Sequence, residues 1–237
     1  MPHPGKAVYR NSTQITLTMN KITILLTVLL LAVACNSNAD KPAPKKAATQ
    51  KGETALTLYV QPYNGFDSIQ AKQIGNDLKK NAKNYADVKI GKVIVLPNKK
   101  LTTAQMNKGK TRYRAEKILN IQLLGKKPNC AEIGLLNEDI STTRVDKKGD
   151  VINEDWGIWG LSRVGQRNSV VSIFRVKHKK DMGKLTLHEF THGMGVHHCT
   201  SGDESCIMSD AKGTPKFGNK NKICDKCLKA LKTNHKH

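Results

Sequence analysis

One short segment constrains this chain more than any other. Residues 187–199 read LHEFTHGMGVHHC and bring together four histidines, a glutamate and a cysteine. His188 and His192 are four positions apart, so on a helix their side chains lie on one face, one turn apart. Two imidazoles placed in this way can bind one zinc ion, and Glu189 is positioned to act as a general base. The segment therefore predicts a helix that carries a metal site.

A glycine after this helix allows a third histidine to reach the metal. Gly195 lies three residues after His192, where a helix can end in a left-handed glycine turn. His198 then completes the register HExxHxxGxxH, whereas His197 is one position out and is expected to be a neighbour. Three histidines leave one zinc position open for water, as in catalytic sites. The predicted ligands of this zinc are His188, His192 and His198, with Glu189 as the base.

Four of the six cysteines lie at the end of this segment or after it. Cys224 and Cys227 form a CxxC pair, whose spacing suits tetrahedral zinc, and Cys199 and Cys206 can supply two further thiolates. In an exported protein the same four cysteines could instead form two disulfides, because thiols oxidise outside the cytoplasm. The CxxC spacing favours zinc, but both alternatives stay open. Cys130 stands apart, and no role is predicted for it.

The N-terminal region is expected to be a targeting signal rather than part of the folded domain. Residues 22–34, ITILLTVLLLAVA, are too short to span a bilayer but suit the apolar core of a signal peptide. A short positive segment starts at Met19, so we expect residues 1–18 to be a non-native upstream extension. Residues 19–35 resemble a bacterial lipoprotein signal, which implies cleavage before a lipidated Cys35; the alternative is a simple secretory signal. Residues 36–54 are expected to be a flexible tether.

The charges of the chain indicate which kinds of partner to expect. Lys and Arg total 40 against 19 acidic residues, a net charge of +21, yet only seven residues are arginine. Arginine is the usual reader of base edges and phosphates, so no nucleic acid is expected as a partner. A lysine-rich surface is expected to be solvated, or attracted to anionic envelope polymers. We expect a monomer in the bacterial cell envelope, lipid-anchored to a membrane.

Residues 55–237 are expected to form one α/β (α+β) domain with a mixed, twisted sheet. Helices are predicted at 67–85 and 111–124, before the metal-carrying helix, and the predicted strands are 55–63, 88–96, 131–136 and 170–176. Trp156 and Trp159 are expected to pack rather than line a cleft. The lysine-rich segments 177–180 and 229–237 are expected to be solvated.

The combined motifs resemble one family. HExxHxxGxxHC, then Cys206-x-Met208, then a later CxxC look like the archaemetzincin family of zinc metalloproteases, within the metzincins. Segments 137–142 and 160–175 are also similar to stretches that precede the family's zinc helix, and the resemblance covers about residues 130–230. It implies a compact metzincin-like domain, Met208 in a Met-turn, and two zinc ions per chain. The catalytic zinc would lie on the three histidines, and a structural zinc on Cys199, Cys206, Cys224 and Cys227.

Two functions are compatible with these features. The first is a zinc metallopeptidase that acts on a peptide or protein, with zinc-activated water as the nucleophile and Glu189 as the general base. The alternative is a non-catalytic, zinc-stabilised envelope-binding lipoprotein. The spacing of Cys199 and Cys206 is longer than in the family, which leaves the geometry of the second metal site open. No residue identifies the substrate or distinguishes an endopeptidase from an aminopeptidase.

Overall fold

A computed structural model of the protein describes residues 55–210 and 217–234. The predictions for residues 1–54, which include the upstream extension, the signal, Cys35 and the tether, lie outside the described residues. Among the residues that are described, no helix has both the length and the apolar character needed to cross a membrane.

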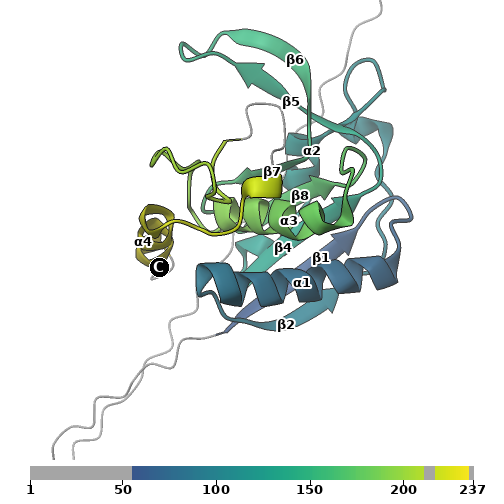
Figure 1. Cartoon of the computed structure of the whole chain (residues 1–237). Coiled ribbons are helices and arrows are strands. Elements are labelled where there is room, and N and C mark those ends of the chain that lie inside the picture. Colours follow the sequence, from purple (N-terminus) through teal and green to yellow (C-terminus); the bar gives the residue numbers. More distant parts are fainter. Residues whose placement is uncertain (1–54, 211–216, 235–237) are drawn as a thin grey trace, which may run out of the picture. The chain divides into compact units, whose positions relative to one another are not determined.

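A five-stranded sheet forms the centre of the domain, in the order β2-β1-β4-β8-β7 (Figure 1). Neighbouring strands from β2 to β8 are parallel, whereas β7 is antiparallel to β8 and forms one edge. This confirms the predicted mixed sheet. The strands in chain order are β1 (Leu56–Pro62), β2 (Ile90–Val95), β4 (Cys130–Leu136), β7 (Gly160–Arg163) and β8 (Asn168–Ser172).

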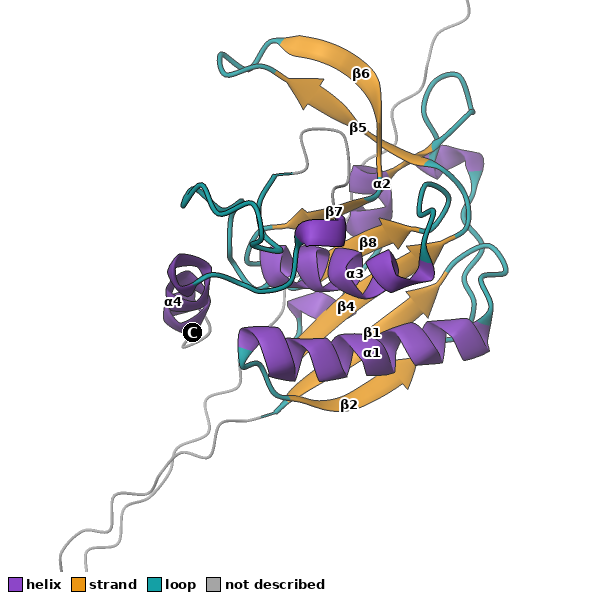
Figure 2. Cartoon of the chain, viewed as in Figure 1, coloured by secondary structure: helices purple, strands orange, loops and turns teal. Residues whose placement is uncertain are grey.

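Helices cover both faces of this sheet. The long helices α1 (Ser68–Ala86) and α3 (Lys179–Gly193) lie side by side on one face (Figure 2). The short helix α2 (Ala115–Asn120) packs on the other face. Because successive residues of a strand point to opposite faces, Leu135 joins the core under α1 and α3 while Leu136 joins the core around α2. Strands β4 and β8 are therefore buried on both sides, which explains the apolar pairs Leu135–Leu136 and Val170–Val171.

A second, three-stranded sheet has the order β3-β5-β6. It consists of β3 (Tyr113–Arg114) and the hairpin of β5 (Ile140–Val145) and β6 (Val151–Ile158), which projects from the body of the domain (Figure 1). Asp139, at the base of the hairpin, accepts hydrogen bonds from Arg175 Nε at 2.6 Å and Arg112 Nε at 2.8 Å. Burial acts to raise the pKa of Asp139, but the two guanidinium groups outweigh it and lower that pKa. This ion network fixes the hairpin to the end of β8.

Three sequence predictions need correction. The helix predicted at 111–124 is limited to α2, because residues 113–114 pair with β5 and residues 124–126 form a 3-10 turn. The strand predicted at 170–176 ends at Ser172, whose hydroxyl accepts a hydrogen bond from the amide of Phe174 and starts a turn. Residues 229–234 of the segment predicted to be solvated belong to helix α4 (Asp225–Asn234); Lys229 and Lys232 are exposed as expected, but Leu231 is buried.

Candidate metal centre

Helix α3 carries the first two histidines on its buried face. His188 Nδ1 lies 2.7 Å from the carbonyl oxygen of Ile207, and His192 Nδ1 lies 2.6 Å from that of Val196. The two Nε2 atoms face each other at 3.0 Å. The i, i+4 spacing on a helix sets this approach, and the two carbonyl groups fix the orientation of both rings.

The hydrogen bonds of these histidines also fix their chemical state. A carbonyl oxygen can only accept, so both Nδ1 atoms carry a proton, and in the neutral ring Nε2 then presents a lone pair. Two lone pairs 3.0 Å apart repel each other unless a cation lies between them. Burial is the largest effect on both rings; it lowers the pKa of His192 to about 4 and that of His188 well below its usual range. The two rings are therefore neutral donors that fit a metal ion.

A glycine turn brings the third histidine to the same point. Helix α3 ends at Gly193, and Gly195 has a φ of +97°, as predicted for a left-handed turn. The ring of His198 then lies 5.4 Å from that of His188 and 4.7 Å from that of His192, measured between ring centroids. The donor atoms of the three rings lie within 4.8 Å of one another. His197 is not among the grouped donors, as its position out of register predicts.

A matched pair of glycine substitutions tests this turn. Both Gly195 and Gly202 have positive φ, so alanine costs about 1–2 kcal/mol in backbone strain at either position. A Cβ at Gly195 would also lie 2.9 Å from the Asn234 side chain, whereas nothing lies within 4 Å at Gly202. We expect Gly195→Ala to lower the free energy of unfolding in urea by clearly more than Gly202→Ala. Equal losses would show that the contact with α4 does not constrain the turn.

Glu189 directly follows His188 on α3, and its carboxyl group contacts strand β7. The residue is only 6% exposed, and its Oε2 lies 2.8 Å from the hydroxyl of Ser162 on strand β7. Burial raises the pKa of Glu189 to about 7, against the opposing effect of the Ser162 hydrogen bond. A pKa near neutrality suits a group that both takes and releases a proton.

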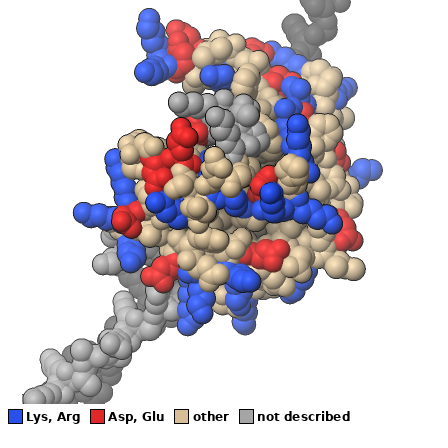
Figure 3. All heavy atoms as spheres, in the orientation of Figure 1, with Lys and Arg blue, Asp and Glu red and all other residues tan. Residues whose placement is uncertain are grey.

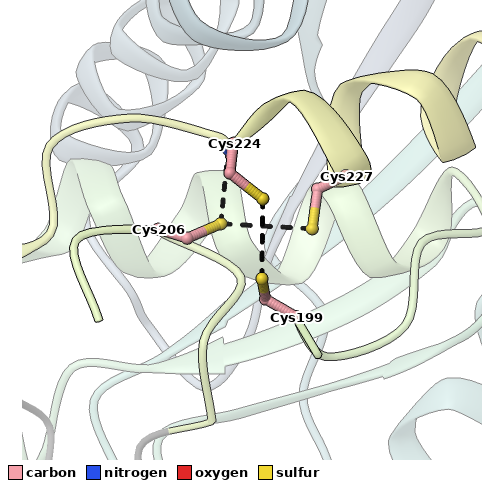
Figure 4. Close-up of side chains that lie close together, drawn as sticks. All are labelled: Cys199, Cys206, Cys224 and Cys227. Carbon is pink, nitrogen blue, oxygen red and sulfur yellow. Dashed lines mark hydrogen bonds between the residues drawn. The ribbon is translucent and has the colours of Figure 1, made fainter. Parts of the chain in front are cut away.

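The structure also brings the four predicted cysteines together (Figure 4). All four are free thiols whose sulfur atoms lie within 4.8 Å of one another. The Sγ atoms of Cys199 and Cys224 are 3.5 Å apart, and those of Cys206 and Cys227 are 4.0 Å apart. Four sulfurs at about 2.3 Å from a zinc ion would be about 3.8 Å apart, whereas a disulfide needs about 2.05 Å. The arrangement fits a tetrahedral metal.

The cysteines differ in acidity. Burial acts to raise the pKa of Cys224, but hydrogen bonds from the Cys227 amide and the Ser201 hydroxyl, among others, lower it to about 6. Burial raises the pKa of Cys206 and Cys227. A thiol must lose its proton to bind zinc, so Cys224 is the best prepared of these three to start metal binding.

A single turn connects the two clusters. Cys206 contributes its thiol to one cluster, while the carbonyl of the next residue, Ile207, accepts from His188 in the other. Met208 is fully buried, and its carbonyl accepts a hydrogen bond of 2.8 Å from the amide of Cys199. Cys199 in turn follows His198 directly. The position of either cluster therefore constrains the other.

Comparisons with known proteins bear on the fold. Scans against protein-family models and curated protein sequences found no match. The solved structure of archaemetzincin from Methanopyrus kandleri is similar, with a TM-score of 0.57 and 22% identity over 80% of this chain and 99% of that one. Archaemetzincin from Archaeoglobus fulgidus, solved with malonate, has a TM-score of 0.54 and 20% identity over 74% of this chain and 99% of that one. The chain has the archaemetzincin fold.

The archaemetzincin fold places several residues at the site that sequence reasoning missed. These are Ser162 and Gly160 on β7, the carbonyl groups of Ile207 and Val196, and Asn234, whose side chain donates to the carbonyl of Gly195 at 2.6 Å. None carries a signal in its local sequence, since each acts through a tertiary contact.

Cys130, Trp156 and Trp159 belong to neither cluster. Cys130 is a half-buried free thiol at the start of β4 and belongs to neither group. Trp159 packs partly against the core and donates from Nε1 to the carbonyl of Arg175 at 3.2 Å, and Arg144 lies over the ring of Trp156. Both tryptophans therefore pack against protein groups, as expected.

Proposed function

We propose that this protein is a zinc-dependent metallopeptidase that hydrolyses peptide bonds. The observation that carries the proposal is the convergence of three imidazoles on one point, with Glu189, the buried residue that follows His188, on the same helix. Three nitrogen donors leave a position for water, which distinguishes a catalytic zinc site from a closed one. The archaemetzincin fold supports the same reading, because its sequence motif is the one that this chain carries at His188, His192 and His198.

The histidines and Glu189 have different roles in the proposed reaction. Zinc held by His188, His192 and His198 would act as a Lewis acid that polarises a carbonyl group and lowers the pKa of bound water to about 7. Glu189 takes a proton from the attacking water and delivers it to the leaving amine. Burial of this carboxyl group favours that role, because it brings the pKa to about 7, close to a neutral operating pH.

The proposal includes a second, structural zinc ion. Cys199, Cys206, Cys224 and Cys227 would hold it, and four thiolates close the coordination sphere to water. Such an ion would join the loop after His198 to the start of α4. Its role would be to hold the third histidine in place, rather than to take part in the reaction.

The alternative function is a non-catalytic, zinc-stabilised envelope-binding lipoprotein. It would use the same fold and the same metal ligands, so metal binding alone cannot separate the two. Peptide-library cleavage read by mass spectrometry, comparing the zinc-replete wild type with Glu189→Gln, separates them. Cleavage that depends on Glu189 supports the peptidase.

Location and partners form a further part of the proposal. We propose that Cys35 is lipidated and anchors a monomer in the bacterial envelope, where it acts on a peptide or protein and not on nucleic acid. On the face shown in Figure 3, basic side chains are spread out with acidic ones between them. This distribution favours a solvated surface over a nucleic-acid track.

Labelling with radioactive palmitate tests the anchor. We expect the protein to incorporate the label when expressed in bacteria and to lose it in a Cys35→Ser variant, because only the cysteine thiol can carry the first lipid group. Cys130→Ser is the matched control and should keep the label. Equal labelling of wild type and Cys35→Ser would rule out this anchor.

A further inference from the structure

Two residues of strand β7 contact or make room for the carboxyl group of Glu189. Gly160 and Ser162 are two positions apart on the strand, so both lie on the face that packs against α3. The Ser162 hydroxyl lies 2.8 Å from Glu189 Oε2 and 2.7 Å from the Glu189 backbone carbonyl. On Gly160, a Cβ atom would lie only 2.7 Å from Glu189 Cγ and 2.8 Å from Oε1. Ser162 supplies a hydrogen-bond partner for Glu189, and Gly160 leaves the space that the Glu189 side chain fills.

We propose that Gly160 and Ser162 form a cradle for the Glu189 carboxyl group, and that Ser162 is a positioning residue for hydrolysis. The role of Ser162 in hydrolysis rests on the proposed peptidase function. Its structural part, the dependence of Glu189 on these two β7 residues, does not need the metal.

The hydroxyl group suits this role because it can both donate and accept. Ser162 has one proton and two acceptors within reach, the carboxyl group and the backbone carbonyl of Glu189. When the carboxylate is ionised, the hydroxyl can donate to Oε2. When Glu189 holds the proton taken from water, the hydroxyl can turn to the backbone carbonyl and accept from the carboxyl group. The contact therefore persists while the proton passes from water to Glu189 and on to the leaving amine.

Gly160 contributes through its missing side chain. It does not lie at positive φ, so the backbone there would accept alanine without strain. The space for a methyl group is instead filled by the side chain of Glu189. Alanine at this position must displace the carboxyl group, which lies on a rigid helix and has few ways to move.

Steady-state kinetics on the zinc-loaded protein provide the first test. Loss of a hydrogen bond to a charged group corresponds to about a 10- to 100-fold change in rate. We expect Ser162→Ala to lower kcat by that factor with KM unchanged, and Ser162→Thr to recover most of the loss. Gly160→Ala should also lower kcat. Ser172→Ala, which removes a sheet hydroxyl bonded to the Glu138 carbonyl, is the control and should keep its kcat.

Thermal unfolding of the metal-free protein provides the second test. Ser162→Ala is expected to lower Tm more in the wild type than in a Glu189→Ala background, because only the former leaves a buried carboxyl group without its partner. Equal Tm shifts in both backgrounds, together with an unchanged kcat in Ser162→Ala, would overturn the cradle. If the wild type shows no metal-dependent hydrolysis, the peptidase proposal fails, and the double-mutant comparison still decides whether the cradle exists.

Discussion

Glu189→Gln is expected to lower kcat by about 10²- to 10⁴-fold while the protein keeps its full zinc content. Glutamine has nearly the same shape as glutamate and can still bond the Ser162 hydroxyl, so the packing against β7 should survive. It cannot take a proton from water, however, and the general base is lost. The three histidines are untouched, so zinc binding should not change.

Peptide-library cleavage and metal analysis of the same samples check this result. Glu204→Gln is the matched control, since Glu204 is an exposed glutamate outside both clusters and should keep wild-type activity. Undiminished cleavage by Glu189→Gln would contradict the general-base role. An absence of cleavage in the zinc-replete wild type would favour the envelope-binding lipoprotein instead.

The metal-carrying residues could be predicted from sequence because their geometry is local. Spacing alone places His188 and His192 on one helix face, and a single glycine turn then brings His198 near them. The groups that orient these residues could not be found in the same way. The carbonyl of Ile207 reaches His188 across 19 residues, and Ser162 reaches Glu189 across 27. Such contacts depend on how β7 and the later loops pack against α3.

The same distinction applies to the fold. Strands β1, β2, β4 and β8 were predictable because each carries a short run or an alternation of β-branched and apolar residues, such as residues 93–95 in β2 and Val170–Val171 in β8. The hairpin of β5 and β6 was missed because it is largely exposed and rich in charged and polar residues. Helix α4 was missed because its lysines resemble a solvated tail. Its buried residues Cys227 and Leu231 are four positions apart, so the sequence does carry a helical spacing there.

Cys206→Ser is expected to remove one zinc equivalent and to lower the free energy of unfolding by several kcal/mol. Cys206 is fully buried, and its sulfur lies 4.0 Å from that of Cys227 and 3.4 Å from the amide of Cys224. Structural zinc in small domains contributes about 10–16 kcal/mol of binding free energy that is also folding free energy. A serine hydroxyl at this position is a poor zinc ligand, so α4 should lose most of its attachment to the loop after His198.

Metal analysis, urea denaturation and thiol counting measure the effect. Cys130→Ser is the control and should retain both zinc ions, because Cys130 belongs to neither cluster. Two disulfides in place of zinc would give at most one zinc per wild-type chain and, after unfolding, no free thiols among the four clustered cysteines. Under that alternative the nearest pairs would be Cys199 with Cys224 and Cys206 with Cys227.

The consequences of Cys206→Ser should extend to hydrolysis. The carbonyl that orients His188 belongs to the residue after Cys206, and His198 directly precedes Cys199. Releasing the cysteine cluster therefore frees one imidazole to rotate and allows another to move away from the metal. We expect kcat and zinc affinity at the histidine site to fall together, whereas Glu189→Gln should lower kcat alone. This contrast distinguishes a residue that moves a proton from one that holds the site in shape.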